Sequence, residues 1–193
     1  DHARIIFTLN TTDALNIGIK GWLKKGDHVV TSVLEHNSVS RPLQRLEGEG
    51  IIQVTRLDCS ADGLIDPDDV KKAITPATRL VVMTHCSNVI GAIQPIREIG
   101  HIAHEAEALF MVDAAQTAGV IPINVIEDHI DMLAFPGHKS LYGPPGSGGL
   151  YVAKDIHLHP WREGGTGGDS SSALQPEAFP YFLEGGTPNT VGI

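Results

Sequence analysis

The feature that most limits the fold of this chain is a series of seven short apolar runs, most of them separated by segments with helical periodicity. The runs span residues 5–8, 28–33, 51–57, 79–84, 108–112, 132–135 and 149–153. Helices are expected to start after Asp13, near Ser38 and Pro67, and after Pro95. Continuous apolar strands that alternate with helices are typical of a parallel sheet covered on both faces. The sequence therefore predicts an α/β fold, with three α/β/α layers around a mostly parallel seven-stranded sheet.

Small polar clusters directly follow five of the predicted strands. They contain Thr11 and Thr12, His36, Asn88, Asp113 and Gln116, and His138 and Lys139. Ligands of open α/β sheets bind outside the carboxyl ends of the strands. Five clusters at one edge of one sheet therefore predict a binding site there. The Gly/Ser-rich stretch 164–172 is expected to be the most flexible part of the chain and a candidate active-site loop.

Lys139 is the candidate nucleophile of this site. It follows a buried strand that stops at Pro136, stands next to His138, and precedes a Gly/Pro-rich segment that cannot be a regular helix. Partial desolvation there would lower the pKa of its ammonium group and make the neutral amine available. Such an amine suits a Schiff base with an aldehyde cofactor. The alternative is an ordinary exposed loop lysine.

Asp113 is the candidate partner of a cationic ligand, because it ends a buried strand where an unpaired negative charge would be costly. A protonated pyridine nitrogen is one such ligand. The alternative is an aspartate that caps the following helix, and Gln116 is by itself a common loop residue. Thr11 and Thr12 stand at a predicted helix start, where hydroxyl and backbone N–H groups can bind an anion or simply cap the helix.

The composition narrows the possible partners. A formal net charge of −9 argues against nucleic acid or an anionic membrane as a partner. Cys59 and Cys86 form neither a disulfide framework nor a metal-ligand spacing, which favours a reducing, cytoplasmic location. No apolar stretch is long enough to span a bilayer. No metal site is expected, because the histidine pairs 101/104 and 157/159 lack a carboxylate or cysteine to complete a shell.

Six segments together give the chain a specific family resemblance. They are NTTDALN, EHNS, HCSNVIG, VDAAQTAG, FPGHKSLYGPPGSGGLYV and FLEGGTPNTVGI, in this order. In these segments the chain resembles the class V aminotransferases, which are fold type I pyridoxal phosphate enzymes, and most closely the cysteine desulfurase and selenocysteine lyase branch. The resemblance implies a pyridoxal 5'-phosphate (PLP) cofactor, a small amino-acid substrate and a homodimer. It also implies that residues 1–193 are the PLP-binding large domain.

The resemblance assigns a role to each candidate residue. Lys139 would form the Schiff base and move the proton at the substrate Cα, and His36 would stack on the cofactor ring. The remaining cofactor contacts would come from Asp113 at the pyridine nitrogen, Gln116 at the phenolic oxygen, Thr11, Thr12 and His138 at the phosphate, Asn88 beside the substrate carboxylate, and Thr187 at the phosphate of the neighbouring subunit.

Two departures from the family pattern leave the reaction open. Pro136 stands where many relatives have a serine that donates to the phosphate. An N-terminal segment and a C-terminal small domain are expected to be missing, and the latter supplies the substrate-binding arginine and the cysteine nucleophile of desulfurases. Cys86 lies close to the predicted site without occupying the place of that nucleophile. Desulfuration is the main hypothesis; transamination to a keto acid and a non-catalytic PLP-fold domain are the alternatives.

Overall fold

The computed structural model describes residues 4–166 and 172–193, so most of the Gly/Ser-rich stretch, residues 167–171, lies outside the described part. Seven strands form one sheet in the order β1-β7-β6-β5-β4-β2-β3. They are β1 (Ile5–Thr8), β2 (His28–Ser32), β3 (Gln53–Leu57), β4 (Thr78–Thr84), β5 (Leu109–Asp113), β6 (Met132–Pro136) and β7 (Gly148–Val152). The predicted seven-stranded α/β architecture is confirmed.

Strand β7 runs opposite to the six other strands of the described sheet. It pairs antiparallel with β6 on one side and with β1 on the other. The pairs β2–β3, β2–β4, β4–β5 and β5–β6 are parallel. Strand β1 therefore points in the same direction as the five other parallel strands, and the carboxyl ends of six strands reach the same edge of the sheet.

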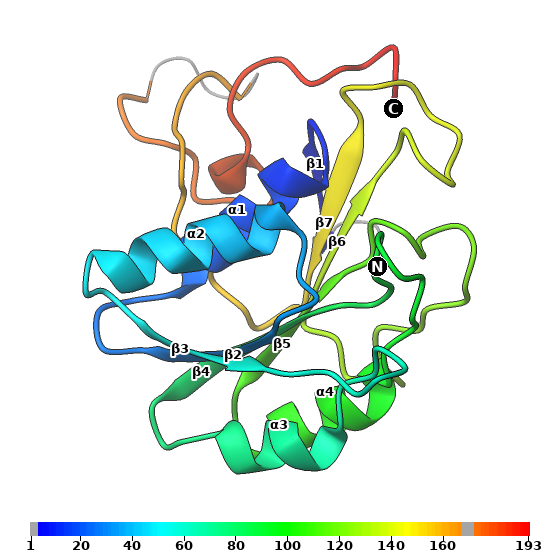
Figure 1. Cartoon of the computed structure of the whole chain (residues 1–193). Helices are drawn as coiled ribbons and strands as arrows, with labels where there is room; N and C mark the ends of the chain where they lie inside the picture. Colours follow the sequence, from blue (N-terminus) through cyan, green and yellow to red (C-terminus); the bar gives the residue numbers. More distant parts are fainter. Residues whose placement is uncertain (1–3, 167–171) are drawn as a thin grey trace.

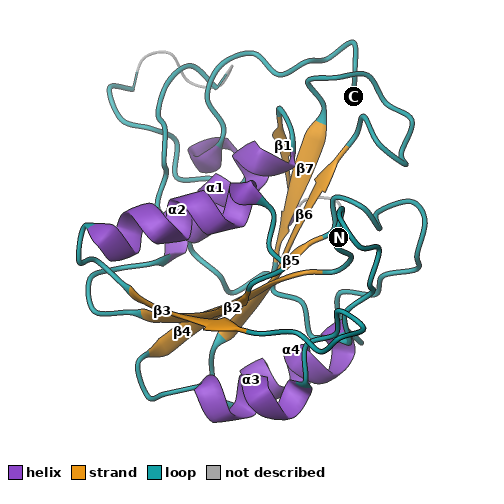
Figure 2. Cartoon of the chain, viewed as in Figure 1, coloured by secondary structure: helices purple, strands orange, loops and turns teal. Residues whose placement is uncertain are grey.

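The helices are α1 (Thr11–Trp22), α2 (Asn37–Gly48), α3 (Pro67–Ala73) and α4 (Ile96–Glu105), with a short 3-10 turn, η2 (Tyr181–Leu183). Helices α1 and α2 cover one face of the sheet, and α3 and α4 cover the other (Figure 1). Figure 2 shows the strands as a layer between the two helical layers. None of the helices in residues 4–166 and 172–193 has the length and apolar character that a membrane span needs.

Two apolar cores fill the space between the layers. The core under α1 and α2 contains Leu15, Val82 and Met111, and the core over α3 and α4 contains Val81, Ile99 and Phe110. Val81 and Val82 are neighbours on β4 and belong to different cores, as alternating side chains of a central strand must. Burial on both faces explains why the strands are continuously apolar in sequence.

The observed boundaries differ from the predicted ones by a few residues. Strand β3 begins at Gln53 instead of Ile51, because the N–H of Ile51 donates to the carbonyl of Leu46 (2.9 Å) and closes the turn after α2. Strand β6 includes Pro136 as its last residue, opposite Gly148 of β7. The predicted stop of this strand at the proline is confirmed.

Candidate active site

A cavity of about 280 Å³ opens at the edge where the parallel strands end. Its walls come from the loops after β1, β2, β4, β5 and β6, so segments far apart in sequence meet there. The lining residues are Asn10, Thr11, Thr12, His36, Ser38, Thr84, Cys86, Asn88, Asp113, Ala115, Gln116, His138 and Lys139. Every candidate site residue taken from the sequence lines this cavity, with the exception of Thr187.

Asp113 is buried at the end of β5, with 3% of its surface exposed. Its Oδ1 accepts a hydrogen bond from the N–H of Ala115 (2.9 Å), and Oδ2 has no hydrogen-bond partner among the described residues. Burial raises the pKa of this carboxyl, while the Ala115 N–H and the charges of His36 and Lys139 act in the opposite direction. No helix follows β5 directly in the described part of the chain, so Asp113 does not cap one, and its Oδ1 instead closes the turn after the strand. The other carboxylate oxygen is free at the cavity.

His36 is held by a chain of hydrogen bonds that links α2 to α1. It caps α2, and its Nδ1 accepts from the N–H of Ser38 (3.2 Å). The Oγ of Ser38 lies 2.8 Å from the same Nδ1 and 2.7 Å from Oγ1 of Thr12. Because a backbone N–H can only donate, Nδ1 is the acceptor, and the proton of a neutral imidazole is on Nε2. The ring is fixed in orientation and tautomer at the cavity wall.

Lys139 lies at the rim of the cavity, and its surroundings bear on one expectation. Lys139 and His138 are both exposed in the single chain, so the neighbouring residues of this chain do not by themselves supply the predicted partial desolvation of the ammonium group. The reason is that the loop after β6 turns outward. The N–H of Tyr142 donates to the carbonyl of Lys139 (2.9 Å), and that of Gly143 donates to the carbonyl of Gly137 (2.8 Å). This tight turn presents the lysine to the cavity mouth.

Thr11 and Thr12 form the first turn of α1, as the sequence predicts. Asn10 caps the helix by accepting the N–H of Asp13 with its side chain (2.9 Å). The cap is therefore Asn10, and neither threonine is needed for it. The hydroxyls and early N–H groups of this turn lie at the cavity, where the positive end of the helix dipole favours an anion.

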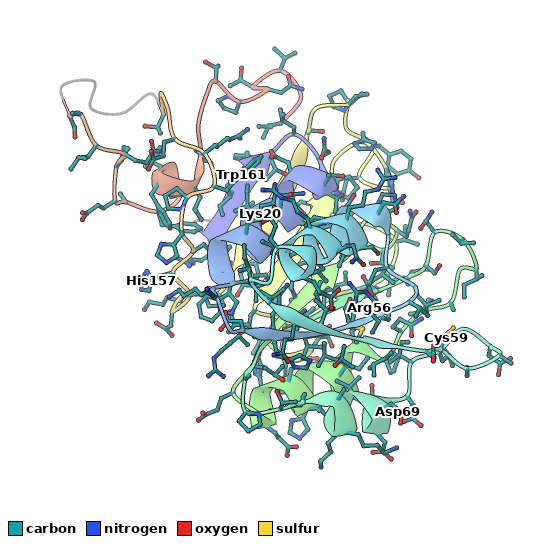
Figure 3. The ribbon with its side chains drawn as sticks, turned by 60° about the vertical axis from the view of Figure 1, so that its left-hand side comes forward. Lys20, Arg56, Cys59, Asp69, His157 and Trp161 are labelled. Carbon is teal, nitrogen blue, oxygen red and sulfur yellow. The ribbon has the colours of Figure 1, made fainter. Side chains whose placement is uncertain are left out.

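Cys86 lines the cavity, and Cys59 does not. Both are free thiols, and Figure 3 shows Cys59 at the periphery of the molecule, on the loop after β3. Asn88 is an exposed residue at the same wall as Cys86, in the loop after β4. The cavity thus combines one amine, one buried carboxyl, three side-chain amides and one thiol.

Thr187 lies outside this cavity. It lines a separate hollow of about 220 Å³ with residues of β1, the C-terminal segment and Arg162. Within one chain it therefore does not join the other candidate residues, and its predicted role toward a neighbouring subunit stays a prediction. Pro136 is buried and is not part of the cavity lining, so it makes no contact there.

The histidine pairs noted in the sequence lie elsewhere. The rings of His101 and His104 each approach that of His129 at 5.4 Å, and His104 Nε2 is 2.9 Å from Oδ2 of Asp131. His157 lies on the outside of the molecule in Figure 3. Among the described residues, no three histidine, cysteine, aspartate or glutamate side chains are grouped so that they could hold a metal ion.

Three residues near the cavity were missed in the sequence. Ser38 and Thr84 line it, and Glu35 is buried directly before His36. Serine and threonine are too common in loops to stand out. Glu35 gives no local signal in the sequence, because glutamate is rarely buried and its partner Thr84 lies on a distant strand.

This arrangement of fold and cavity agrees with the comparisons. A family model described as aminotransferase class-V matches residues 1–193, and the chain belongs to this family. Among curated proteins it is similar to a probable cysteine desulfurase of Methanothermobacter thermautotrophicus, with 42% identity over 195 residues, 98% of this chain and 48% of that protein. The chain spans about half the length of the curated relatives it matches.

Comparison with solved structures indicates the same family. The apo cysteine desulfurase from Thermococcus onnurineus NA1 has a TM-score of 0.88 at 35% identity and covers 100% of this chain and 50% of that chain. A structure described as SspA in complex with cysteine has a TM-score of 0.86 at 36% identity, with 98% and 52% covered. The predicted family and fold are confirmed.

Proposed function

We propose that residues 1–193 form the PLP-binding large domain of an enzyme that removes sulfur or selenium from cysteine or selenocysteine. The observation that carries this proposal is Asp113, a buried carboxyl with one free oxygen, in the same cavity as Lys139 and the first turn of α1. A site with these three parts suits a ligand that has a basic nitrogen, an aldehyde and an anionic group. PLP has all three.

The residues present fit the cofactor. Asp113 would accept from the pyridine nitrogen through Oδ2, and Gln116 would bind the phenolic oxygen. The phosphate would be held by Thr11, Thr12 and His138, and His36 would pack on the ring. When bound, PLP supplies an electron sink for the carbanion formed at a substrate carbon.

The protein side chains supply binding and proton transfer. Lys139 Nζ would bind the aldehyde carbon and move the proton at the substrate Cα. Its position at the open rim of the cavity gives it access to the cofactor and to the substrate. Asn88 would orient the substrate carboxylate. Ser38 and Thr12 hold the His36 ring in place, so that the ring does not need to reorganise during the reaction.

The proposed substrate is cysteine because the relatives named above are cysteine desulfurases and one similar structure is described as a complex with cysteine. Transamination remains the alternative within enzymes. Incubation of the full-length protein with cysteine and excess dithiothreitol should yield alanine and sulfide in equal amounts, because the dithiol takes up the released sulfur and supplies the two electrons that reduce it to sulfide. A keto acid would instead identify a transaminase. A purified protein that binds PLP but forms neither alanine with sulfide nor a keto acid would favour the non-catalytic alternative.

The proposed active unit is a homodimer. Val89 and Ile90 after β4, and Leu141 and Tyr142 after β6, are apolar or aromatic and 46–94% exposed around the cavity mouth. A second copy that covers this rim would exclude water from Lys139 and bring its own Thr187 to the phosphate. Sedimentation should give a dimer, and Tyr142→Glu should shift it to monomer. We also propose a cytoplasmic location, which suits the two free thiols; cell fractionation tests it.

The cofactor assignment is tested at Lys139. Purified protein mixed with PLP and reduced with borohydride should carry the covalent label on Lys139 in a peptide map. Lys139→Ala should lose the label, and the exposed Lys154→Ala variant should keep it. A label on Lys154 or on any other lysine would show that the site is assigned wrongly.

A further inference from the structure

Glu35 is a buried carboxyl beside the cavity to which no role has been given above. It stands between β2 and α2, directly before His36, and 9% of its surface is exposed. Its Oε1 accepts from Oγ of Ser32 (2.6 Å) and from the N–H of Thr84 (3.0 Å). Its Oε2 is buried and has no hydrogen-bond partner among the described residues.

These contacts connect Glu35 to residues that line the cavity. Thr84 is the last residue of β4 and pairs with Asp113 of β5 in the parallel register. Thr84, Asp113 and His36 all line the cavity, and Glu35 does not. Glu35 therefore holds the end of β2 and the start of α2 against the end of β4. This contact lies close to Asp113, the carboxyl proposed to face the cofactor.

The surroundings of Glu35 do not support a negative charge. No described cation forms an ion pair with it, and β2 and β4 contribute the uncharged Ser32 and Thr84. Burial raises the pKa of Glu35 to about 8, although the hydrogen bonds from Ser32 and Thr84 lower it, and the charge of Asp113 raises it further. A buried carboxyl in this position is protonated at neutral pH, because taking an unpaired charge out of water costs more than holding the proton.

We infer that Glu35 is a positioning residue that acts as a neutral carboxylic acid. It holds Thr84 and the His36 turn in place, and it leaves Asp113 as the single negative charge offered to the cofactor. This inference rests on the proposed function only for the identity of that cofactor. If Glu35 and Asp113 were both ionised near one pyridine nitrogen, the two carboxylates would repel each other and weaken the pairing at the ends of β4 and β5. A neutral Glu35 avoids this repulsion.

The substitutions that separate charge from position are Glu35→Gln and Glu35→Ala. Glutamine keeps the acceptor oxygen and the volume without a charge, whereas alanine leaves the Ser32 hydroxyl and the Thr84 N–H without their acceptor. The exposed Glu98→Gln serves as the matched control. At pH 7 the PLP dissociation constant of Glu35→Gln should lie within about twofold of the unsubstituted protein, and that of Glu35→Ala should rise about tenfold or more.

A pH profile of the bound cofactor's absorbance distinguishes positioning next to Asp113 from a purely structural role. The unsubstituted protein should show a step near pH 8 that Glu35→Gln lacks and Glu98→Gln keeps. In the cofactor-free protein, the infrared band of a protonated carboxylic acid should be present at pH 7 and lost in Glu35→Gln. This band does not depend on PLP, so failure of the proposed function would leave it intact.

Three results would overturn the inference. They are absence of the carboxylic acid band at pH 7, a tenfold loss of PLP affinity in Glu35→Gln, and identical absorbance profiles for Glu35→Gln and the unsubstituted protein at every pH.

Discussion

The neutral state of Glu35 should determine how the stability of the cofactor-free protein changes with pH. Its pKa in the folded chain is about 8, against 4.5 for the exposed side chain. Below pH 4.5 both the folded and the unfolded chain hold the proton. As the pH rises from 4.5 to 8, the unfolded chain releases the proton first, so the free energy of unfolding falls. The stabilisation by the retained proton is therefore lost as pH rises through this window.

The size of the effect follows from the pKa difference. One pKa unit corresponds to about 1.4 kcal/mol. Within this window the free energy of unfolding of the unsubstituted protein should therefore fall by about 1.4 kcal/mol per pH unit relative to that of Glu35→Gln. Between about pH 5.5 and about pH 7.5 the difference in unfolding free energy between the two proteins should change by roughly 3 kcal/mol. Groups far from Glu35 titrate alike in both proteins and cancel in this comparison.

The assay is urea unfolding of both proteins, without cofactor, at half-unit steps from about pH 5 to about pH 9. Glu98→Gln should run parallel to the unsubstituted protein over the whole range, because its side chain is exposed. A constant difference between Glu35→Gln and the unsubstituted protein would refute the reasoning, since it would mean that Glu35 ionises alike in the folded and unfolded chains.

Other substitutions test the site and the packing around it. Ser38→Ala should leave the fold intact and weaken PLP binding about fivefold, because the His36 ring loses one of its two tethers; unchanged binding in an absorbance titration would contradict this. Asp113→Asn should weaken PLP binding about tenfold or more, since the amide cannot accept from the pyridine nitrogen as an anion does; the same titration measures it. Gly100→Ala should destabilise the protein by about 1–3 kcal/mol in urea, because its Cβ would overlap the backbone oxygen of Asp128. Gly48→Ala, with open space around it, should stabilise α2 by up to about 1 kcal/mol in the same experiment.

The layers and the strand ends could be predicted because they depend on local pattern. Apolar runs place the strands, and Pro136 ends β6 as its missing N–H requires. The direction of β7 could not be predicted, since an apolar run of five residues is the same read in either direction. Only the pairing with β1 and β6 fixes it as antiparallel.

The candidate site could be predicted to the extent that its residues follow strands directly. Asp113 and His36 do so, and both lie at the cavity. The surroundings of Lys139 could not be predicted, because its exposure depends on what covers the rim of the cavity and not on the residues beside it in sequence. Glu35 was missed because its burial depends on Thr84, which is 49 residues further along the chain.

The position of β1 has a consequence for how the protein is made. Ile5 pairs with Tyr151, which lies 146 positions further along the chain. At roughly 5–20 residues per second, synthesis of that length takes on the order of 10–30 seconds, during which β1 has no strand to pair with. Thr11, which follows β1 directly, is therefore placed only after the rest of the sheet exists. The Thr11 side of the cavity is therefore completed last, and a ligand captured by a nascent chain would have to wait for β7.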